Sequence, residues 1–185
     1  MKTILAFLLV LSLASFQPAA TIYQANPDAS QLTWTGHAEA GTWAPTGSVQ
    51  LQRGTFEYDG RTLRNARFEF DMRTIKQEDA KLAEHLRGTD FFDAEQYPTA
   101  VFVLREMKDG TAAGQLTLKG TTKPVQFPLT LERLPNGQLR IKGTATLDRT
   151  QFGINYNSSS FFQNLGSYAI RNDFQLAFTI VAAKS

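Results

Sequence analysis

The sequence contains no cysteine, only two histidines and little excess of charge of either sign. Without cysteine, disulfides, thiolate metal ligands and lipid attachment through a thiol are excluded. The 185 residues carry a formal net charge of +2 and no basic or acidic block, so a nucleic-acid partner is not expected. Stability must therefore come from a hydrophobic core and from sheet closure, which a chain of this length can provide.

Only one long apolar run is present, at residues 4–13, and it follows a basic start and precedes several small residues. This pattern is typical of a secretory signal peptide, and the run is about half as long as a bilayer span requires. We predict a signal peptide over residues 1–20, with cleavage after Ala20 favoured over Ala14. Residues 21–185 are expected to form one domain without a transmembrane segment, in the periplasm or outside the cell.

From residue 31 onward, apolar and polar side chains alternate, which is the pattern of strands with one buried face. Ala66, Phe68, Phe70 and Met72 alternate with charged residues, and similar stretches recur as far as Ile180. Short Gly-containing turns, such as Asp59-Gly60 and Asp109-Gly110, separate the stretches and favour hairpins. The chain is therefore mainly antiparallel β structure.

Three local features interrupt this pattern. Residues 77–87 have helical spacing and stop at Gly88, which predicts one short inserted helix. Arg53-Gly54 breaks an alternating run and indicates a bulge or a sharp bend. Pro124 and Pro128 remove backbone donors, so their strand is expected to be an edge strand or to be bulged.

Strands with one apolar face need a shared interior, which either a two-sheet sandwich or a closed barrel provides. The alternation alone does not separate these two architectures. About eight strands in a barrel leave an interior that is filled by side chains or holds one small ligand. The composition alone favours the filled core, because phenylalanine, present 14 times, is an ordinary core residue.

A series of short motifs adds information beyond the alternation. In chain order they are Trp34-Thr35-Gly36, Phe70-Asp71-Met72, His85-Leu86, Asp90-Phe91-Phe92-Asp93, Tyr97-Pro98, Gly114, Leu116-Thr117, Gly120, Thr122-Lys123-Pro124, Asp148-Arg149-Thr150-Gln151-Phe152-Gly153-Ile154, Phe161-Phe162 and Leu165-Gly166. In their order and spacing they resemble the YceI-like, polyisoprenoid-binding family from about Asn26 to Lys184. The resemblance implies an all-β fold, namely a closed antiparallel lipocalin-like barrel of about eight strands with one short inserted helix.

The resemblance also implies that the barrel holds a long apolar lipid, of polyisoprenoid, isoprenoid-quinone or fatty-acyl type. Burying hydrocarbon contributes about 0.8 kcal/mol per CH₂, so such a site needs no catalytic group and no cofactor. Combined with the alternation, it predicts ligand contacts from Trp34, Leu51, Phe56, Phe68, Phe70, Phe102, Leu116, Leu118, Phe127, Leu129, Ile141, Phe174 and Phe178. His85 and Asp90 are the polar candidates at the mouth.

Reactive chemistry has weaker support in the sequence. His37 and His85 have no spacing typical of a zinc site, so no metal is predicted. Asp90 and Asp93 are better explained by turn formation than by a catalytic carboxylate pair. Three hypotheses stay open, in this order: a non-enzymatic lipid carrier, a hydrolase or isomerase acting on a lipophilic substrate, and an interaction module with a solid core. The oligomeric state is open, with a homodimer as one option.

Overall fold

The computed structural model describes residues 20–185, so the predicted signal segment lies outside the described residues except for Ala20. The strands are β1 (Thr21–Ala25), β2 (Gln31–Thr35), β3 (Thr46–Tyr58), β4 (Leu63–Lys76), β5 (Thr99–Lys108), β6 (Thr111–Leu118), β7 (Thr121–Arg133), β8 (Leu139–Asp148) and β9 (Asp173–Lys184). One α-helix, α1 (Ala80–Arg87), and three 3₁₀ helices, η1 (Pro27–Ala29), η2 (Arg149–Phe152) and η3 (Gly166–Tyr168), complete the described elements.

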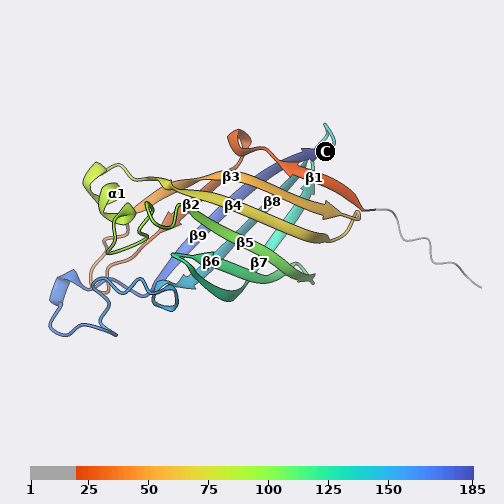
Figure 1. The fold of residues 1–185 in the computed structure, drawn as a ribbon. Coiled ribbons are helices and arrows are strands. Elements are labelled where there is room, and N and C mark those ends of the chain that lie inside the picture. Colours follow the sequence, from red (N-terminus) through yellow and green to blue (C-terminus); the bar gives the residue numbers. More distant parts are fainter. Residues whose placement is uncertain (1–19) are drawn as a thin grey trace, which may run out of the picture.

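The strands form one antiparallel sheet that closes on itself. Their order is β1-β3-β2-β9-β8-β7-β6-β5-β4, and β3, which is second in this order, also pairs with β4, which is last, so the sheet closes. Both β1 and β2 pair with β3 on one side and β9 on the other, so they share one position that η1 interrupts. Nine strands with two in one position fill eight positions, which confirms the predicted closed barrel (Figure 1).

The inserted helix lies at one end of the barrel, between β4 and β5 (Figure 1). It begins at Ala80 rather than at residue 77, because the Asp79 side chain accepts hydrogen bonds from two backbone amides of the first turn. Gly88 ends it as predicted, although its φ is −72° rather than left-handed. The Gly88 amide instead donates to the last carbonyls of the helix.

The structure confirms the predicted turn at Asp109-Gly110 and the predicted bulge near Arg53. Asp109 and Gly110 have φ values of 49° and 74° and join β5 to β6 directly, as a two-residue hairpin with both central residues left-handed requires. The register between β3 and β4 shifts between Leu51 and Arg53, which is the predicted bulge. The ring of Phe68 on β4 occupies the space that a side chain at Gly54 would need.

The barrel wall is only partly paired between β7 and β8. The ladder between β7 and β8 runs only from Leu129, opposite Gly143, to Arg133, opposite Leu139. Residues 121–128 of β7 pair with β6 alone, and residues 144–148 of β8 pair with β9 alone. Pro124 and Pro128 both lie in this half-paired part of β7, where a missing backbone donor is tolerated. The predicted edge strand is thus an edge over half its length, inside a closed barrel.

Two packed clusters of apolar side chains form the core. One lies at the end away from α1 and includes Tyr23 and Phe56, whose rings stack with centroids 5.5 Å apart and planes 1° from parallel. The other lies at the α1 end and includes Ile75, Leu86 and Phe91. Because the far end is closed by large buried side chains, access to the interior is expected from the α1 end, which we call the mouth.

Candidate functional site

The candidate site is an apolar cavity of about 80 Å³ inside the barrel. Its lining includes eight of the residues predicted to contact a ligand: Phe68, Phe70, Phe102, Leu116, Phe127, Leu129, Ile141 and Phe178. They come from β4, β5, β6, β7, β8 and β9, so the alternation of many strands converges on one space. Every side chain of the lining is hydrocarbon, and the cavity offers no group for acid–base or nucleophilic chemistry.

A second cavity of about 80 Å³ lies at the mouth. It contains the predicted residues Trp34 and Phe174, together with apolar residues of α1 and of the segment that follows it. Unlike the inner cavity, it also borders polar residues, namely His37, Arg149, Arg171 and Asp173. Polar groups therefore lie only towards the entrance, which is the arrangement needed for a lipid with its tail inside and its head outside.

Three predicted residues border neither cavity. Leu51 and Phe56 belong to the packed cluster at the closed end, and Leu118 belongs to the cluster near α1. Phe56 is only 2% exposed and is held between Tyr23 and Phe68. Contact with a ligand stays a prediction for every residue of the set, and these three are the least accessible to one.

Several residues that line the inner cavity were not predicted from the sequence as ligand contacts. They are Leu32, Leu63, Ala66, Leu104, Val125, Leu147 and Ile180. The alternation could have found Leu32, Val125 and Ile180, because each lies two residues from a predicted contact on the same strand. Ala66 and Leu104 carry the same signal, because they lie two residues from Phe68 and Phe102; Leu63 and Leu147 do not lie two residues from any predicted contact.

The two cavities are small compared with the several hundred Å³ of typical ligand sites. The interior is thus hollow but narrow, and a chain of several isoprene units fits only if lining side chains move. Phe70, Leu116, Val125, Phe127 and Phe178 are only partly buried, although they face inward. They border free space, and they are the side chains that can turn to widen it.

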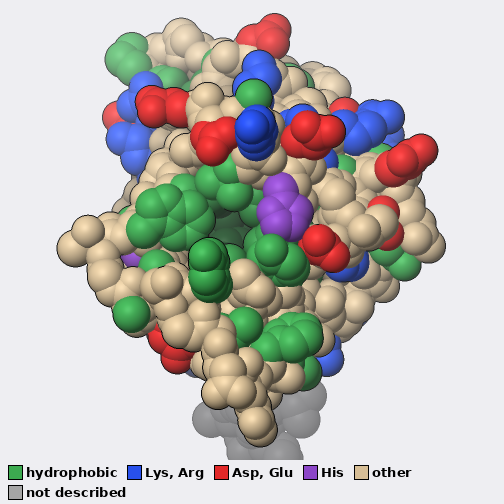
Figure 2. Space-filling view, turned by 90° about the vertical axis from the view of Figure 1, so that its left-hand side faces the viewer, with side chains coloured by type: hydrophobic (Ala, Val, Ile, Leu, Met, Phe, Trp, Pro, Cys, Tyr) green, Lys and Arg blue, Asp and Glu red, His purple; other side chains and the backbone are tan. Residues whose placement is uncertain are grey.

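His85 and Asp90, the predicted polar pair, meet at the mouth. His85 Nε2 lies 3.2 Å from Asp90 Oδ2, and both side chains are partly exposed. The imidazole also packs edge-on against the rings of Phe91 and Tyr156, at centroid distances of 5.1 and 4.7 Å. His85 borders a groove of about 290 Å³ that shares Trp43, Leu82, Phe91 and Ile170 with the mouth cavity. Figure 2 shows this face, with hydrophobic side chains and a histidine around a hollow.

A buried arginine fixes the loops of the mouth. Arg149 is 5% exposed, and its guanidinium donates to the backbone oxygens of Ile154, Ile170 and Arg171 at 2.8, 3.0 and 3.0 Å. Burial lowers the pKa of Arg149 from its ordinary value. The positive charge of the guanidinium is stabilised by carbonyl dipoles of the segments on either side of residues 155–169. Arg149 therefore ties the ends of this loop together beneath the mouth cavity.

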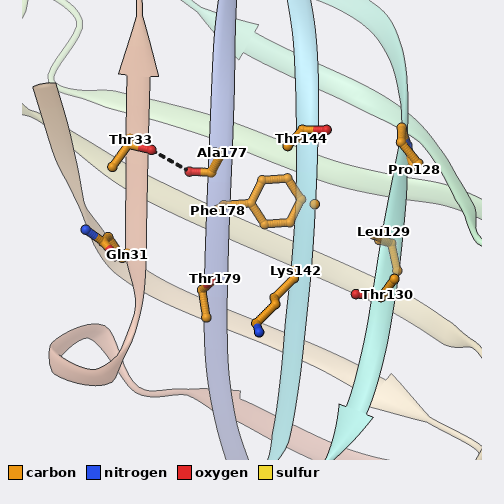
Figure 3. Close-up of a pocket in the computed structure, with 11 residues that line it drawn as sticks. Gln31, Thr33, Pro128, Leu129, Thr130, Lys142, Thr144, Ala177, Phe178 and Thr179 are labelled. Carbon is orange, nitrogen blue, oxygen red and sulfur yellow. Dashed lines mark hydrogen bonds between the residues drawn. The ribbon is translucent and has the colours of Figure 1, made fainter. Parts of the chain in front are cut away.

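The outer wall carries a separate, open groove of about 430 Å³ across β2, β9, β8 and β7 (Figure 3). Its walls are mostly polar side chains, and the Thr33 hydroxyl donates to the Ala177 carbonyl at 3.2 Å. It shares Leu129 and Phe178 with the inner cavity, at the point where β7 and β8 begin to part. These two side chains are all that the outer groove and the interior have in common.

Other kinds of site have no support in the described part of the chain. No group of three or more His, Asp or Glu side chains among residues 20–185 is placed to hold a metal ion. In the same range, no helix is both long enough and apolar enough to cross a membrane.

The chain is similar to known proteins over most of its length. The YceI-like domain profile matches residues 23–182. A UPF0312 protein of Pseudomonas fluorescens is 30% identical over 156 residues, which cover 75% of each chain. A UPF0312 protein of Pseudomonas putida is 34% identical over 113 residues, which cover 55% of this chain and 59% of the relative. For the first curated relatives, therefore, the match spans about three fifths of their length.

Solved structures show the same fold. The structure of BcnA from Burkholderia cenocepacia superposes with a TM-score of 0.68 at 20% identity, over 86% of this chain and 99% of BcnA. A polyisoprenoid binding domain from Saccharophagus degradans, implicated in plant cell wall breakdown, gives a TM-score of 0.67 at 11% identity, over 88% and 98%. At these identities the superpositions establish the architecture, while ligands have to be argued from the residues of this chain.

Proposed function

The chain belongs to the YceI-like domain family, and on this premise we propose that it is a binding protein whose barrel encloses the apolar chain of a lipid. The observation that carries the proposal is the inner cavity, which is lined only by hydrocarbon side chains from most strands of the barrel. An interior filled completely by side chains would instead have favoured the third hypothesis, an interaction module with a solid core. The second cavity, which shares no lining residue with the first, lies at the mouth, and polar groups border it there.

The energetics favour binding without chemistry. Each five-carbon isoprene unit could contribute roughly 4 kcal/mol through burial, and ordering the flexible chain offsets a large share of this gain. Because the cavity is narrow, opening the lining also costs free energy. A long ligand, which gains more free energy because it buries more hydrocarbon, is therefore favoured over a short compact one. We propose a polyisoprenoid, isoprenoid-quinone or fatty-acyl chain as the ligand class; the Saccharophagus neighbour supports the first of these.

Catalysis on a lipophilic substrate is the second hypothesis, and the lining argues against it. The titratable side chains that border the two cavities, namely His37, Arg149, Arg171 and Asp173, all line the mouth cavity. A reacting bond inside the barrel would meet only Phe, Leu, Val, Ile and Ala side chains. We therefore propose that the protein carries or sequesters its lipid unchanged, and that it does so as an exported protein.

The test is native mass spectrometry of purified protein, followed by organic extraction and by titration with polyprenol, quinone and fatty amide. We expect one bound lipid per barrel. Val125→Trp should fill the cavity and lower uptake strongly, whereas Gln126→Trp places the same bulk on the exposed outer face of the same strand and should leave uptake unchanged. Protein that stays empty with every lipid, or equal uptake by the two variants, would contradict the proposal.

A further inference from the structure

The mouth carries nearly all of the exposed large hydrophobic side chains of the described residues. Five such residues occur among residues 20–185, and four of them, Trp43, Phe161, Phe162 and Tyr168, lie on two loops at the mouth, residues 36–45 and 153–172, at 52, 55, 50 and 76% exposure. The fifth, Ile22, lies on β1 at the opposite end of the barrel (Figure 1). Exposed aromatic side chains gathered on one face mark an interaction site, whereas scattered ones do not. We call these four residues the aromatic rim.

The two loops of the rim form one surface. Residues 36–45 and 153–172 are joined by backbone hydrogen bonds from Glu39 to Ala169 and from Arg171 to His37, at 2.9 and 3.0 Å. Trp43 and Tyr168 border the same groove, although they come from different loops. Figure 2 shows the result, a hollow surrounded by hydrophobic side chains. Trp43 and Tyr168 therefore border the entrance, and Phe161 and Phe162 lie on the same loop as Tyr168.

The charge of this surface indicates the kind of partner. The two loops contain one acidic residue, Glu39, and one basic residue, Arg171. Glu39 accepts a hydrogen bond from the Ser159 hydroxyl at 2.9 Å, and Arg171 is paired with Asp173 at 2.8 Å. The loops thus present aromatic rings with no net charge and no basic cluster for anionic lipid. Trp and Tyr side chains are favoured at the interface of a bilayer, where a ring is apolar on one side and hydrated on the other.

We propose that the aromatic rim docks on the surface of a zwitterionic lipid bilayer, with the mouth facing the membrane. This inference rests on the proposed function, because a lipid that moves between bilayer and barrel would then avoid crossing water. Because the rim is neutral, it suits a bilayer without net charge, whereas a basic patch would have indicated a bilayer rich in anionic lipid. The docked protein would lie on the membrane and would not span it.

The experiment measures partition of the full protein onto phosphatidylcholine vesicles by co-flotation. The double variant Phe161→Ser/Phe162→Ser should partition at least about tenfold less than the wild type, because it loses two exposed aromatic contacts. Ile22→Ser removes a residue of equal exposure from the far end of the barrel and should leave partition unchanged. Adding anionic lipid or salt should have little effect. Trp43 is one of only two tryptophans, so its emission should shift to the blue and be quenched by brominated acyl chains.

Several outcomes would overturn the inference. One is wild-type protein that does not bind the vesicles, and another is a double variant that binds as well as the wild type. A third is a rim that instead holds two copies together, seen as a dimer that becomes a monomer in the double variant without any vesicle binding. Lipid content separates this inference from the proposed function. Protein that retains an extracted lipid but ignores vesicles refutes docking alone, and protein that binds vesicles but never takes up lipid refutes the carrier function alone.

Discussion

The ring of Phe178 on β9 lies against Gly143 on β8, in the place where a side chain at residue 143 would stand. The two residues are cross-strand partners, and Gly143 is also the last residue of β8 that pairs with β7. Phe178 borders both the inner cavity and the outer groove. The glycine thus lets an aromatic ring lie flat at the point where the barrel wall opens.

The first prediction follows from this contact. Gly143→Ala should lower the free energy of unfolding by about 1–3 kcal/mol, because the added methyl group overlaps the Phe178 ring and the Pro128 carbonyl. Urea denaturation measures the change. Gly36→Ala is the matched control, since a β-carbon there meets nothing within 4 Å, and its effect should stay within about 0.5 kcal/mol. Equal effects of the two substitutions would show that the ring moves aside freely.

Phe178 also shows what the sequence could predict about the fold. The alternation in β9 placed Phe178 and Ile180 on the buried face, and both contribute to the packed interior. The closure of the barrel had no such local signal. It depends on β1 and β9 pairing across almost the whole chain, and on β1 and β2 sharing one position. Hydrophobic pattern reports which face is buried but not which strands meet, so only the family resemblance selected a barrel over a sandwich.

The second prediction concerns a buried carboxylate on the outer wall. The Glu69 side chain is 6% exposed and accepts hydrogen bonds from Arg53 and Arg67, each at 2.8 Å. The hydrogen bond from Arg53 is the largest cause of a pKa of Glu69 below its ordinary 4.5, and burial opposes it. Because the folded-state pKa is the lower one, this stabilisation is present above about pH 4.5 and is lost as the pH falls through the folded value.

Glu69→Gln should therefore destabilise the protein by about 1 kcal/mol near neutral pH, a modest value because both arginines are solvent-exposed. The difference from the wild type should shrink below pH 4.5. Chemical denaturation at a series of pH values measures this. Glu132→Gln is the control, because its carboxylate meets Arg140 at 2.9 Å but is 54% exposed, and the change should be smaller. A Glu69→Gln difference that is constant down to acid pH would contradict the assignment.

The third prediction tests the tether beneath the mouth. Arg149→Met removes the donors to Ile154, Ile170 and Arg171 and should cost about 2–3 kcal/mol, because buried carbonyls lose their partners. Arg149→Lys keeps a charge but cannot reproduce the planar fork, so it should restore only part of the stability. Hydrogen exchange should accelerate in residues 153–172 in both variants. Arg140→Met, which breaks only a surface ion pair, should leave that exchange unchanged.

The candidate site was less predictable than the fold. Alternation identifies inward positions, and eight of the predicted contacts do surround the inner cavity. It could not tell that Leu51, Phe56 and Leu118 are packed in closed clusters, because a core and a cavity wall have the same periodicity. The alternation does not indicate the size of the cavity either. It depends on how side chains from several strands interlock, which no local stretch of sequence records.

His85 and Asp90 are five residues apart, and the helix end brings them within 3.2 Å, so a contact between these two predicted mouth residues could be expected from the sequence. The structure shows that the imidazole is held mainly by the rings of Phe91 and Tyr156. Asp90→Ala should then change the free energy of unfolding by less than about 0.5 kcal/mol, because the pair is exposed. His85→Ala should cost about 1–2 kcal/mol through the lost aromatic contacts.

Substitutions of His85 also distinguish a side chain that only stabilises the fold from one that limits passage through the entrance. His85 borders the groove that leads to the mouth cavity, so its removal should widen the entrance and speed the release of bound lipid. His85→Phe keeps a ring between Phe91 and Tyr156 and should restore both stability and slow release, although it cannot bond to Asp90. Dilution into lipid-free buffer with a fluorescent fatty-acyl probe measures the release rate. If His85→Phe releases the probe as fast as His85→Ala, the polar contact with Asp90, and not the ring, controls the entrance.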